Sequence, residues 1–432
     1  MPSAPTFGEA FRYWLKLGFI SFGGPTGQIA IMHRDLVEKK RWIDEEHFLQ
    51  ALNFCMLLPG PEAQQLAIYI GWLLHGAKGG IVAGLFFILP SIFILWGLSW
   101  LYAALGNVPA VEAFFYGLKP AVAAIVVEAV FRIGKKSLKN GLLISLAAAS
   151  FIGIYFLHIP FPAIILTAGF IGYAGGLYFP ATLAAAGNKR PAGSSDYVIS
   201  GSDAPRGDRA NWRHTVKVIA FFLPLWFSPI IALGLWRGWD DIFIDIGVLF
   251  SKAAMVTFGG AYAVLAYIGQ QAVAQYGWLQ PEQMMDGLGL AETTPGPLIM
   301  VTQFVGYVAA YTHARGLPPA VAGAIGGLLT TWTTFVPCFM WIFAGAPYIE
   351  RLRRNLKLGA ALSAITAAVV GVVLNLSVIF SIHVLLPDHK TLDWYALAAT
   401  LVAMVGMLRF KWGMIPVIIG SATAGFVWRM FA

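Results

Sequence analysis

The stretch "CMLLPGPEAQQLAIYIGW", residues 55–72, is apolar enough for a membrane, yet Pro-Gly-Pro interrupts it. Proline lacks a backbone N–H and fixes φ, so Pro59 should end one helix. Proline is also favoured at the first position of a helix, which suits Pro61. We therefore predict a helix, a break and a second helix. Irregular backbone at membrane depth is tolerated only inside protein or along a watery cavity, so the break marks either a functional site or a packing hinge.

The composition around this stretch is that of a membrane protein. Of the 432 residues, 58% are hydrophobic and 12% are charged, and the mean hydropathy is +0.71. Soluble domains carry about 25% charged residues. Long apolar runs, without the alternating pattern of a β-barrel, predict an all-α polytopic membrane protein. The net charge of +8 is spread over short loops, which indicates positive-inside bias and not nucleic-acid binding.

Membrane spans of about 20 apolar residues are predicted along the whole chain. Two stretches, 46–76 and 282–312, contain Pro-Gly-Pro and should form re-entrant hairpins or pairs of short helices. The remaining predicted spans are 7–32, 79–104, 110–133, 139–157, 160–180, 217–236, 243–268, 316–343, 357–382, 392–408 and 412–431.

The chain contains an internal repeat. Sliding the sequence along itself until Pro59-Gly60-Pro61 lies on Pro295-Gly296-Pro297 brings several other motifs into register without a gap. Separated matches at one offset indicate a duplicated unit. The predicted organisation is a first repeat (1–183), a polar linker (184–212), an extra apolar segment (213–240) and a second repeat (241–432). The same shift aligns Lys16 with Lys252, Phe22-Gly23-Gly24 with Phe258-Gly259-Gly260, Trp42 with Trp278, and Glu46 with Glu282.

Basic residues in equivalent loops indicate that the two repeats face opposite ways. Residues 33–42, "HRDLVEKKRW", are basic, whereas their equivalents 269–278, "GQQAVAQYGW", contain no Lys or Arg. The bias changes sign in two later loop pairs as well. Because cytoplasmic loops are rich in Lys and Arg, the halves should form an inverted-topology repeat. Counting each span as one crossing gives parallel halves instead, so we predict that 217–236, which holds two prolines, is interfacial or re-entrant.

The duplicated motifs supply candidate groups for binding an anion. A helix that begins after a break has free N–H groups and a positive dipole end. Lys16 and Lys252 each precede a glycine pair by about two turns and so share its face; alternatively, both extend to the membrane interface. The predicted substrate-binding residues are Lys16, Ser21, Gly23, Gly24, Gly60, Pro61, Glu62, Gln64, Gln65, Lys252, Thr257, Gly259, Gly260, Gly296 and Pro297.

Carboxylates within apolar stretches are functional candidates. Glu292 lies at the C-terminal end of a helix, where the dipole disfavours a negative charge, so it is the favoured proton carrier. Glu62 follows Pro61 directly and either caps its helix or carries a proton. Glu128 is the third predicted proton-coupling residue, and Asp286 also interrupts an apolar run. The sequence contains no HExxH, GxSxG or GxxxxGK[ST] motif and no metal-ligand spacing.

Several of these stretches together resemble one protein family. They are "FGGPTGQIAIMHRDLVEKKRWIDEEHF", "NFCMLLPGPEAQQLAIYIGW" and "FILPS" in the first half, and "TFGGAYAVLAYI" and "LAETTPGPLIMVTQFVGY" in the second. Both glycine-pair motifs and both Pro-Gly-Pro motifs match the chromate ion transporter family, in its long two-domain form. Within the motif, Ala261 replaces the first-half proline Pro25, so the halves need not bind alike.

The resemblance implies efflux of chromate across the bacterial inner membrane, with sulfate as a related or competing dianion. Transport would be driven by the membrane potential or a proton gradient, through antiparallel homologous halves. The expected partners are the oxyanion and the lipid bilayer, with no nucleic acid, no metal and no cofactor; homodimer formation is left open. The alternatives are a permease for sulfate or another oxyanion, an oxyanion channel, and an intramembrane enzyme, for which the sequence offers no catalytic motif.

Overall fold

The computed structural model describes residues 4–106, 108–178, 197–199, 212–258, 260–349, 356–387 and 391–431. These residues are helical apart from turns, loops and one isolated bridge between Ile43 and Ile199. Six of the described helices are long and apolar enough to cross a membrane. The prediction of an all-α, multi-pass membrane protein is therefore confirmed. Most of the predicted linker 184–212 lies outside the described residues, and the predicted domain boundaries stay a prediction.

The first half begins with short broken helices and continues with longer ones. In chain order its elements are α1 (Phe7–Ile20), α2 (Gly24–His33), the π-helical η1 (Arg34–Lys39), α3 (Glu45–Leu57), α4 (Glu62–Leu105), α5 (Pro109–Ser137), α6 (Gly141–Tyr155) and α7 (Phe161–Tyr178). The backbone of α4 is non-helical at His75 and Gly76. This kink divides α4 into a short first part and a longer second part, close to the boundary that the sequence predicts between 46–76 and 79–104.

The second half repeats this order after α9 (Trp212–Arg237). Its elements are α10 (Ile242–Val256), α11 (Ala261–Gly269), the π-helical η3 (Gln270–Gln275), α12 (Pro281–Thr293), the 3-10 turn η4 (Leu298–Met300), α13 (Val301–His313), α14 (Pro319–Gly345), the 3-10 turn η5 (Ala346–Tyr348), α16 (Leu356–Leu385), α17 (Trp394–Phe410) and α18 (Met414–Phe431). The bounds of η1 and η3, and of α3 and α12, are separated by the same offset that aligns Pro59 with Pro295. The two repeated halves are therefore present in the fold.

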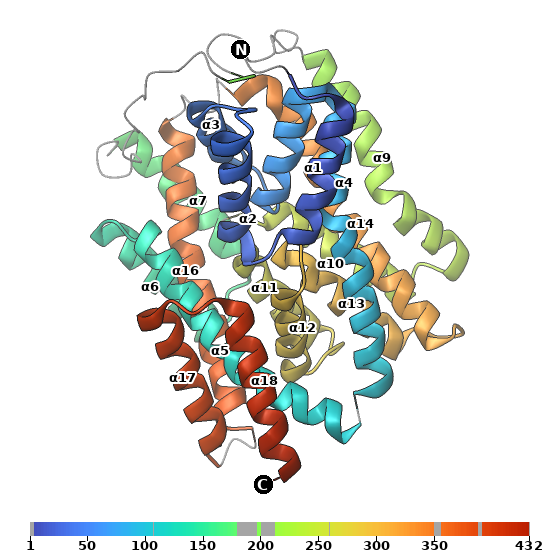
Figure 1. Cartoon of the computed structure of the whole chain (residues 1–432), viewed down its shortest axis with the longest axis vertical. Helices are drawn as coiled ribbons and strands as arrows, with labels where there is room; N and C mark the ends of the chain where they lie inside the picture. Colours follow the sequence, from blue (N-terminus) through green and yellow to red (C-terminus); the bar gives the residue numbers. More distant parts are fainter. Residues whose placement is uncertain are drawn as a thin grey trace.

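The second part of α4 and its counterpart α14 in the second half run in opposite directions. The second part of α4 corresponds to α14, since Pro90 and Pro337 occupy matching places in them. A β-carbon on Gly80 would meet the Phe343 ring, whereas one on Gly84 would meet the Phe339 ring. Residue numbers thus rise along α4 as they fall along α14, and the two helices are antiparallel. The colours along the sequence in Figure 1 agree with this arrangement.

The predicted span 7–32 is wrong as a single crossing. The chain breaks after Ile20, Gly23 has a φ of +86°, and α2 begins at Gly24. The chain then returns to the end from which it started, because Trp42 packs edge-on against Tyr13 with their ring centroids 5.4 Å apart. The predicted span 243–268 is broken in the same way, between α10 and α11. Neither α1 nor α2 is long enough to cross a membrane, since each helical residue adds only about 1.5 Å of length.

The prediction that 217–236 is interfacial or re-entrant is also wrong. This segment lies within α9, one continuous helix with high mean hydropathy. Near one end, His214 bonds to the Phe343 carbonyl (3.3 Å), and at the other end Arg237 bonds to the Arg315 carbonyl. The helix therefore runs the whole length of α14, as Figure 1 shows. The count of membrane passages was therefore wrong because 7–32 reverses direction. The segment 217–236 had been counted correctly.

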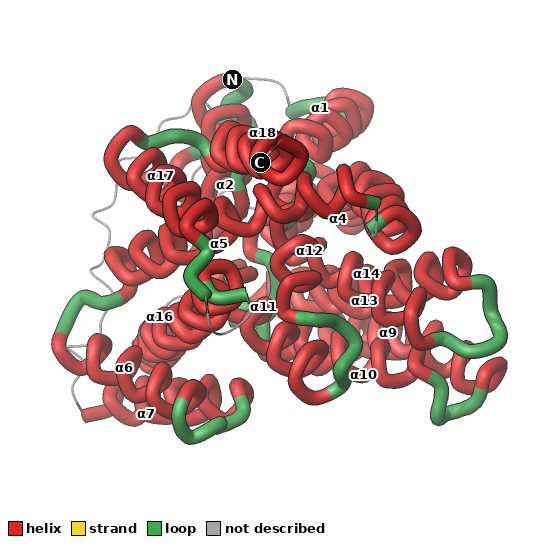
Figure 2. The backbone as a smooth tube through the Cα atoms, turned by 90° about the horizontal axis from the view of Figure 1, so that it is seen from below, coloured by secondary structure: helices red, strands yellow, loops and turns green. Residues whose placement is uncertain are grey.

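The outer helices are exchanged between the halves. Helix α5 packs against α17 and α18 of the second half, and α16 packs against α6 and α7 of the first. Gly117 on α5 lets α18 approach so closely that a β-carbon there would lie 2.7 Å from the Cα of Gly425. Small residues allow such close helix packing in membranes. Figure 2 shows α5, α11 and α12 near the middle of the bundle, with α6 and α7 at one margin and α9 at another.

If the halves are inverted across the membrane, η1 and η3 lie on opposite faces. In the second half, too, the chain returns to its starting end, since Tyr276, just after η3, lies close enough to Asp245 at the start of α10 to interact electrostatically. We expect a membrane-impermeant thiol reagent to label Glu38→Cys and Gln275→Cys from opposite sides of the membrane. Cys55 and Cys338 are buried, so the unsubstituted protein is the control. Labelling of both new cysteines from one side would contradict the inversion.

Candidate functional site

Each Pro-Gly-Pro break is bound to the glycine-pair break of the other half. The N–H of Gly60 donates to the Thr257 carbonyl, and the N–H of Gly296 donates to the Ser21 carbonyl, both at 2.8 Å. The two bonds are equivalent under the repeat, so a pseudo-two-fold axis relates them. We call the Gly60–Thr257 contact the first crossing and the Gly296–Ser21 contact the second crossing. The sequence predicted the two Pro-Gly-Pro breaks, but neither the two glycine-pair breaks nor this reciprocal pairing.

The glycines of the two Pro-Gly-Pro motifs are required by backbone geometry. Gly60 has a φ of +129° and Gly296 a φ of +106°, which L-residues with a side chain rarely adopt. A β-carbon on Gly60 would lie 2.6 Å from the Gln65 amide nitrogen, and one on Gly296 would lie 2.7 Å from the Ser91 β-carbon. The positive φ therefore disfavours a larger residue at both positions, and close packing adds to this most clearly at Gly296, where the nearest atom is a β-carbon.

The helices that begin at the breaks leave their first N–H groups free. A helix has no internal partners for its first N–H groups. Helices α3, α6, α10 and α17 are capped by the side chains of Asp44, Asn140, Asp241 and Asp393. By contrast, the N-cap residues at the breaks provide no side-chain cap: Gly23 before α2, Pro61 before α4, Gly260 before α11 and Pro297 before η4. The breaks thus offer a set of uncapped, electropositive helix starts.

The elements that begin at the breaks contact one another inside the protein. Helix α2 contacts α4, and η4 contacts α4 and α11. Pro61, Ala261 and Leu298, at three of these starts, are all buried. The N-terminal ends of these helices carry unpaired N–H groups and the positive ends of the helix dipoles, which favour an anion nearby.

The buried hydroxyls of Ser21 and Thr257 donate their protons within their own helices and not toward a ligand. Each donates a 2.6 Å hydrogen bond to the carbonyl four residues earlier in its own helix, Leu17 for Ser21 and Ala253 for Thr257. Such bonds to the i−4 carbonyl bend or end a helix. In this structure, neither hydroxyl is therefore available to donate the hydrogen bond to a substrate that the sequence had predicted.

The first crossing contains a carboxylate. Glu62, the first residue of α4, is partly buried, and its Oε1 would lie 3.6 Å from a β-carbon on Gly260. It thus sits at the starts of both α4 and α11, where the helix dipoles favour a negative charge. The amide of Gln65 donates to the Pro59 carbonyl at 2.8 Å and steadies the same turn. This position is compatible with both roles predicted for Glu62, capping the helix and carrying a proton.

The second crossing is held by a glutamine that the sequence analysis missed. Gln28 on α2 is fully buried, and its amide donates to the Gly296 carbonyl at 2.6 Å and to the Ser21 carbonyl at 3.4 Å. The equivalent residue in the second half is Val264. The signal was an amide inside an apolar run, "GQIAIMH". The two crossings are therefore alike in backbone and different in side chains.

Glu292 belongs to a buried polar cluster. Its side chain is 3% exposed and accepts a 2.6 Å hydrogen bond from the Tyr262 hydroxyl, at the start of α11. Arg132 and Glu128 on α5 lie close enough to act electrostatically on Glu292 and are 3.6 Å from each other. The predicted coupling residues Glu292 and Glu128 are thus brought together, and Tyr262 and Arg132 are additions that the sequence analysis did not single out.

The two duplicated lysines do not enter this buried region. Lys16 and Lys252 are both exposed, as expected for lysines that extend to the membrane interface. The cations that act on the central carboxylates come instead from α5, Arg132 on Glu292 and Lys136 on Glu62. Their i, i+4 spacing places them on one helix face. The sequence analysis did not single out either residue.

The other predicted residues have structural positions. Gly24 begins α2, Pro297 precedes η4, and the Gln64 amide donates to the Gly84 carbonyl at 3.4 Å, which ties the two parts of α4 together. Gly259 lies outside the described residues. Asp286 is a second buried carboxylate; it accepts a 3.0 Å bond from the Tyr102 hydroxyl and lies 4.0 Å from the Lys119 amine.

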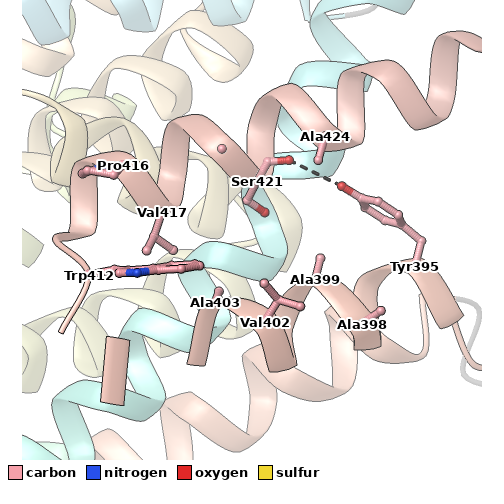
Figure 3. Close-up of a pocket in the computed structure, with 11 residues that line it drawn as sticks. Tyr395, Ala398, Ala399, Val402, Ala403, Trp412, Pro416, Val417, Ser421 and Ala424 are labelled. Carbon is pink, nitrogen blue, oxygen red and sulfur yellow. Dashed lines mark hydrogen bonds between the residues drawn. The ribbon is translucent and has the colours of Figure 1, made fainter. Parts of the chain in front are cut away.

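A hollow of about 590 Å³ lies apart from the crossings, between α17 and α18. It is lined mainly by small apolar side chains, including Ala399, Ala403 and Val417, as Figure 3 shows. The Tyr395 hydroxyl at its margin donates to the Ser421 carbonyl at 3.4 Å. A hollow of this composition suits lipid tails or helix packing and offers no charge to an anion.

The fold and the paired breaks define a class of membrane protein, built from two repeated halves whose broken helices meet at the centre. The model of the chromate transporter family matches residues 8–173 and 244–426, one match to each half. The chain belongs to this family.

Relatives align along most of their length. The chromate transport protein of Cupriavidus metallidurans is 28% identical over 98% of this chain and 94% of its own. The chromate transport protein of Pseudomonas aeruginosa is 31% identical over 86% of this chain and 80% of its own. An uncharacterized transporter of Methanocaldococcus jannaschii is 25% identical over 98% and 94%. No solved structure matches the chain.

Replacing either central glycine should disrupt the crossings. We expect Gly60→Ala and Gly296→Ala each to lower the free energy of unfolding by about 1–3 kcal/mol, because a β-carbon is strained at positive φ. Thermal unfolding of the purified protein measures this effect. Gly97→Ala is the matched control, since nothing lies within 4 Å of a β-carbon there. Equal melting temperatures for all three variants would show that the crossings do not depend on these glycines.

Proposed function

We propose that this protein is a secondary active transporter that exports chromate across the bacterial inner membrane, with sulfate as a related or competing oxyanion. The observation that carries the proposal is the reciprocal pair of crossings, where uncapped helix starts from both halves meet inside a membrane bundle. Membership of the chromate transporter family, and relatives named as chromate transport proteins, support this substrate class.

The proposed binding site lies between the two crossings. Backbone N–H groups at the starts of α2, α4, α11 and η4 would bind the oxygens of a tetrahedral anion. Arg132 and Lys136, on the neighbouring face of α5, would offset part of its charge. Lys16 and Lys252 are left out of this site because both side chains are exposed.

The proposed mechanism is alternating access between inverted repeats. Each break is held by a bond to the other half, so movement of one half against the other must change both crossings together. Rocking of one repeat around a fixed central site is how many inverted-repeat transporters expose their substrate to each side in turn. An anion channel would have the same composition but would not need to alternate between two conformations open to opposite sides.

Export of a dianion from a cell that is negative inside is favoured by the membrane potential. The potential contributes about 2.3 kcal/mol per elementary charge per 100 mV. A proton gradient is therefore an additional driving force and not a requirement. If it is used, Glu292 and Glu62 are the proposed proton carriers, since both lie beside helix starts where an arriving oxyanion would compete with a carboxylate for the same N–H groups.

Transport can be tested with inverted membrane vesicles. We expect labelled chromate to accumulate in vesicles that contain the protein, and excess sulfate to slow its uptake. Preloading the vesicles with unlabelled chromate should accelerate the entry of labelled chromate, because a carrier that moves outward with bound substrate is quickly available to bring label in. Uptake without such counterflow supports a channel. Absence of chromate and sulfate uptake under any gradient overturns the proposal, and loss of chromate by reduction without uptake supports an enzyme.

Glu292→Gln should separate proton coupling from binding. The variant keeps the size of the side chain and a hydrogen-bond partner for Tyr262 but cannot ionise. We expect chromate uptake driven by the membrane potential alone to persist, and its stimulation by a proton gradient to fall at least about tenfold. Tyr262→Phe, which removes the bond and keeps the carboxyl, is the comparison. Full proton stimulation in Glu292→Gln excludes Glu292 as the proton carrier.

A further inference from the structure

A second polar site lies at one end of the molecule, away from the crossings. A hollow of about 360 Å³ is formed between the first turns of α1 and the segment η1. It is lined by four cations and two carboxylates along with one tyrosine: Arg12, Lys16, Lys39, Lys40, Glu9, Asp35 and Tyr13. The structure brings these residues together because the α1–α2 hairpin returns the chain to its starting end.

Four cations line this hollow against two carboxylates, which leaves a positive excess, although Glu9 also lies close enough to Lys40 and Arg12 to interact with them electrostatically. Glu9 accepts hydrogen bonds from the N–H and the hydroxyl of Thr6 (2.7 and 3.0 Å), in the cap of α1. Asp35 is paired with Arg34 and Lys39, at 3.3 and 3.7 Å. Among the residues that the structure describes, no carboxylate lies within ion-pair distance of Arg12, Lys16 or Lys40.

Tyr13 adds an unused hydrogen-bond donor. The side chain is only 5% exposed, and its buried hydroxyl has no hydrogen-bond partner. Buried hydroxyls are normally bonded, so an unpaired one calls for an explanation. Lys40 packs over the Tyr13 and Trp42 rings, with its amine 5.7 and 4.7 Å from the two centroids. The ring is thus held in place beside a cation while its hydroxyl stays without an acceptor.

The second half lacks this arrangement. Under the repeat, Lys16 corresponds to Lys252, but Arg12, Tyr13, Lys39 and Lys40 correspond to Val248, Leu249, Gln275 and Tyr276. Since the halves run in opposite directions, one end of the molecule has a cationic hollow and the other end does not. Duplication alone would give two equal ends, so the difference was introduced separately.

We propose that the α1–η1 hollow is a loading site, which binds a tetrahedral oxyanion before it reaches the crossings. This inference rests on the proposed transport function and adds a direction to it. The basic segment 33–42 places the hollow on the cytoplasmic side by the positive-inside rule. A cluster of positive charge raises the local concentration of an anion and its association rate by about 10–10³-fold. The hollow thus favours capture from the cytoplasm, as export requires.

The transport test compares two charge-loss variants in inverted vesicles, whose outer surface is the cytoplasmic face. We expect Arg12→Gln/Lys16→Gln to raise the half-saturating chromate concentration about tenfold at low ionic strength and to leave the maximal rate within about twofold of the unsubstituted protein. The effect should largely disappear in 1 M salt, where the Debye length is about 3 Å. Tyr13→Phe should raise the half-saturating concentration without this salt dependence.

The matched control is Arg213→Gln/Lys217→Gln, which removes two positive charges from the exposed start of α9 at the same end of the molecule (Figure 1). We expect no change in its half-saturating concentration. An equal change in both double variants would reduce the effect to general surface charge and overturn the loading site. Unchanged kinetics in the Arg12→Gln/Lys16→Gln protein, with transport intact, would overturn it while leaving the proposed function standing.

A binding test that needs no transport separates the two hypotheses. The purified protein in phosphatidylcholine nanodiscs is treated with an amine-acetylating reagent, with and without sulfate, and modification of Lys16 and Lys217 is read by mass spectrometry. We expect sulfate to protect Lys16 at least about threefold more than Lys217. Protection by phosphatidylglycerol and not by sulfate would identify a lipid-headgroup site and overturn the proposal. Sulfate protection in a protein that fails to transport would support the hollow and reject the transport function.

Discussion

Two backbone hydrogen bonds, one from each Pro-Gly-Pro break to the opposite glycine-pair break, are the constraint on which this fold depends. A buried N–H without a partner is costly in a membrane, and each break satisfies part of that requirement through the other half. Neither half can therefore complete its own centre. The exchange of outer helices, in which α5 packs on α17 and α18 while α16 packs on α6 and α7, extends the same mutual dependence to the periphery.

This constraint also explains what the centre contains. The breaks end helices early and start new ones without side-chain caps, so free N–H groups gather where a soluble protein would place Ser, Asp or Asn. The two crossings differ in their side chains: Glu62 and Gln65 at the first, Gln28 at the second. A symmetric backbone thus holds an asymmetric polar environment. The cations that act on its carboxylates, Arg132 and Lys136, both come from α5 in the first half.

The sequence was sufficient for the features that repeat or that follow from proline and glycine. Hydropathy predicted the class, the single repeat offset predicted the two halves, and Pro-Gly-Pro predicted the breaks in 46–76 and 282–312. The reversal at Gly23 was missed, because an apolar run that is long enough to cross gives no sign that it folds back. That one error produced the mistaken treatment of 217–236, which is part of the continuous helix α9.

Side-chain partners could not be predicted, because they depend on which helices meet. The spacing of Lys16 before Gly23 predicted a shared helix face, but α1 ends at Ile20, so Gly23 is not on the helix of Lys16, and the lysine is exposed. Gln28 bonds to Gly296 in the other half, and Tyr262 bonds to Glu292 on α12. Both partners are far away along the chain, so no local sequence pattern indicates them. Glu292 was identified as a buried carboxylate from its surroundings, but its partner was not.

The most direct test of the central claim is the position of the bound anion. Crystals of the protein soaked in chromate allow anomalous scattering from chromium to locate it without ambiguity from other atoms. We predict a chromium site between the two crossings, with its oxygens within hydrogen-bond distance of the N–H groups at the starts of α4 and α11 or of α2 and η4. Chromium bound only elsewhere in the protein, with both crossings empty at a saturating concentration, would contradict the account.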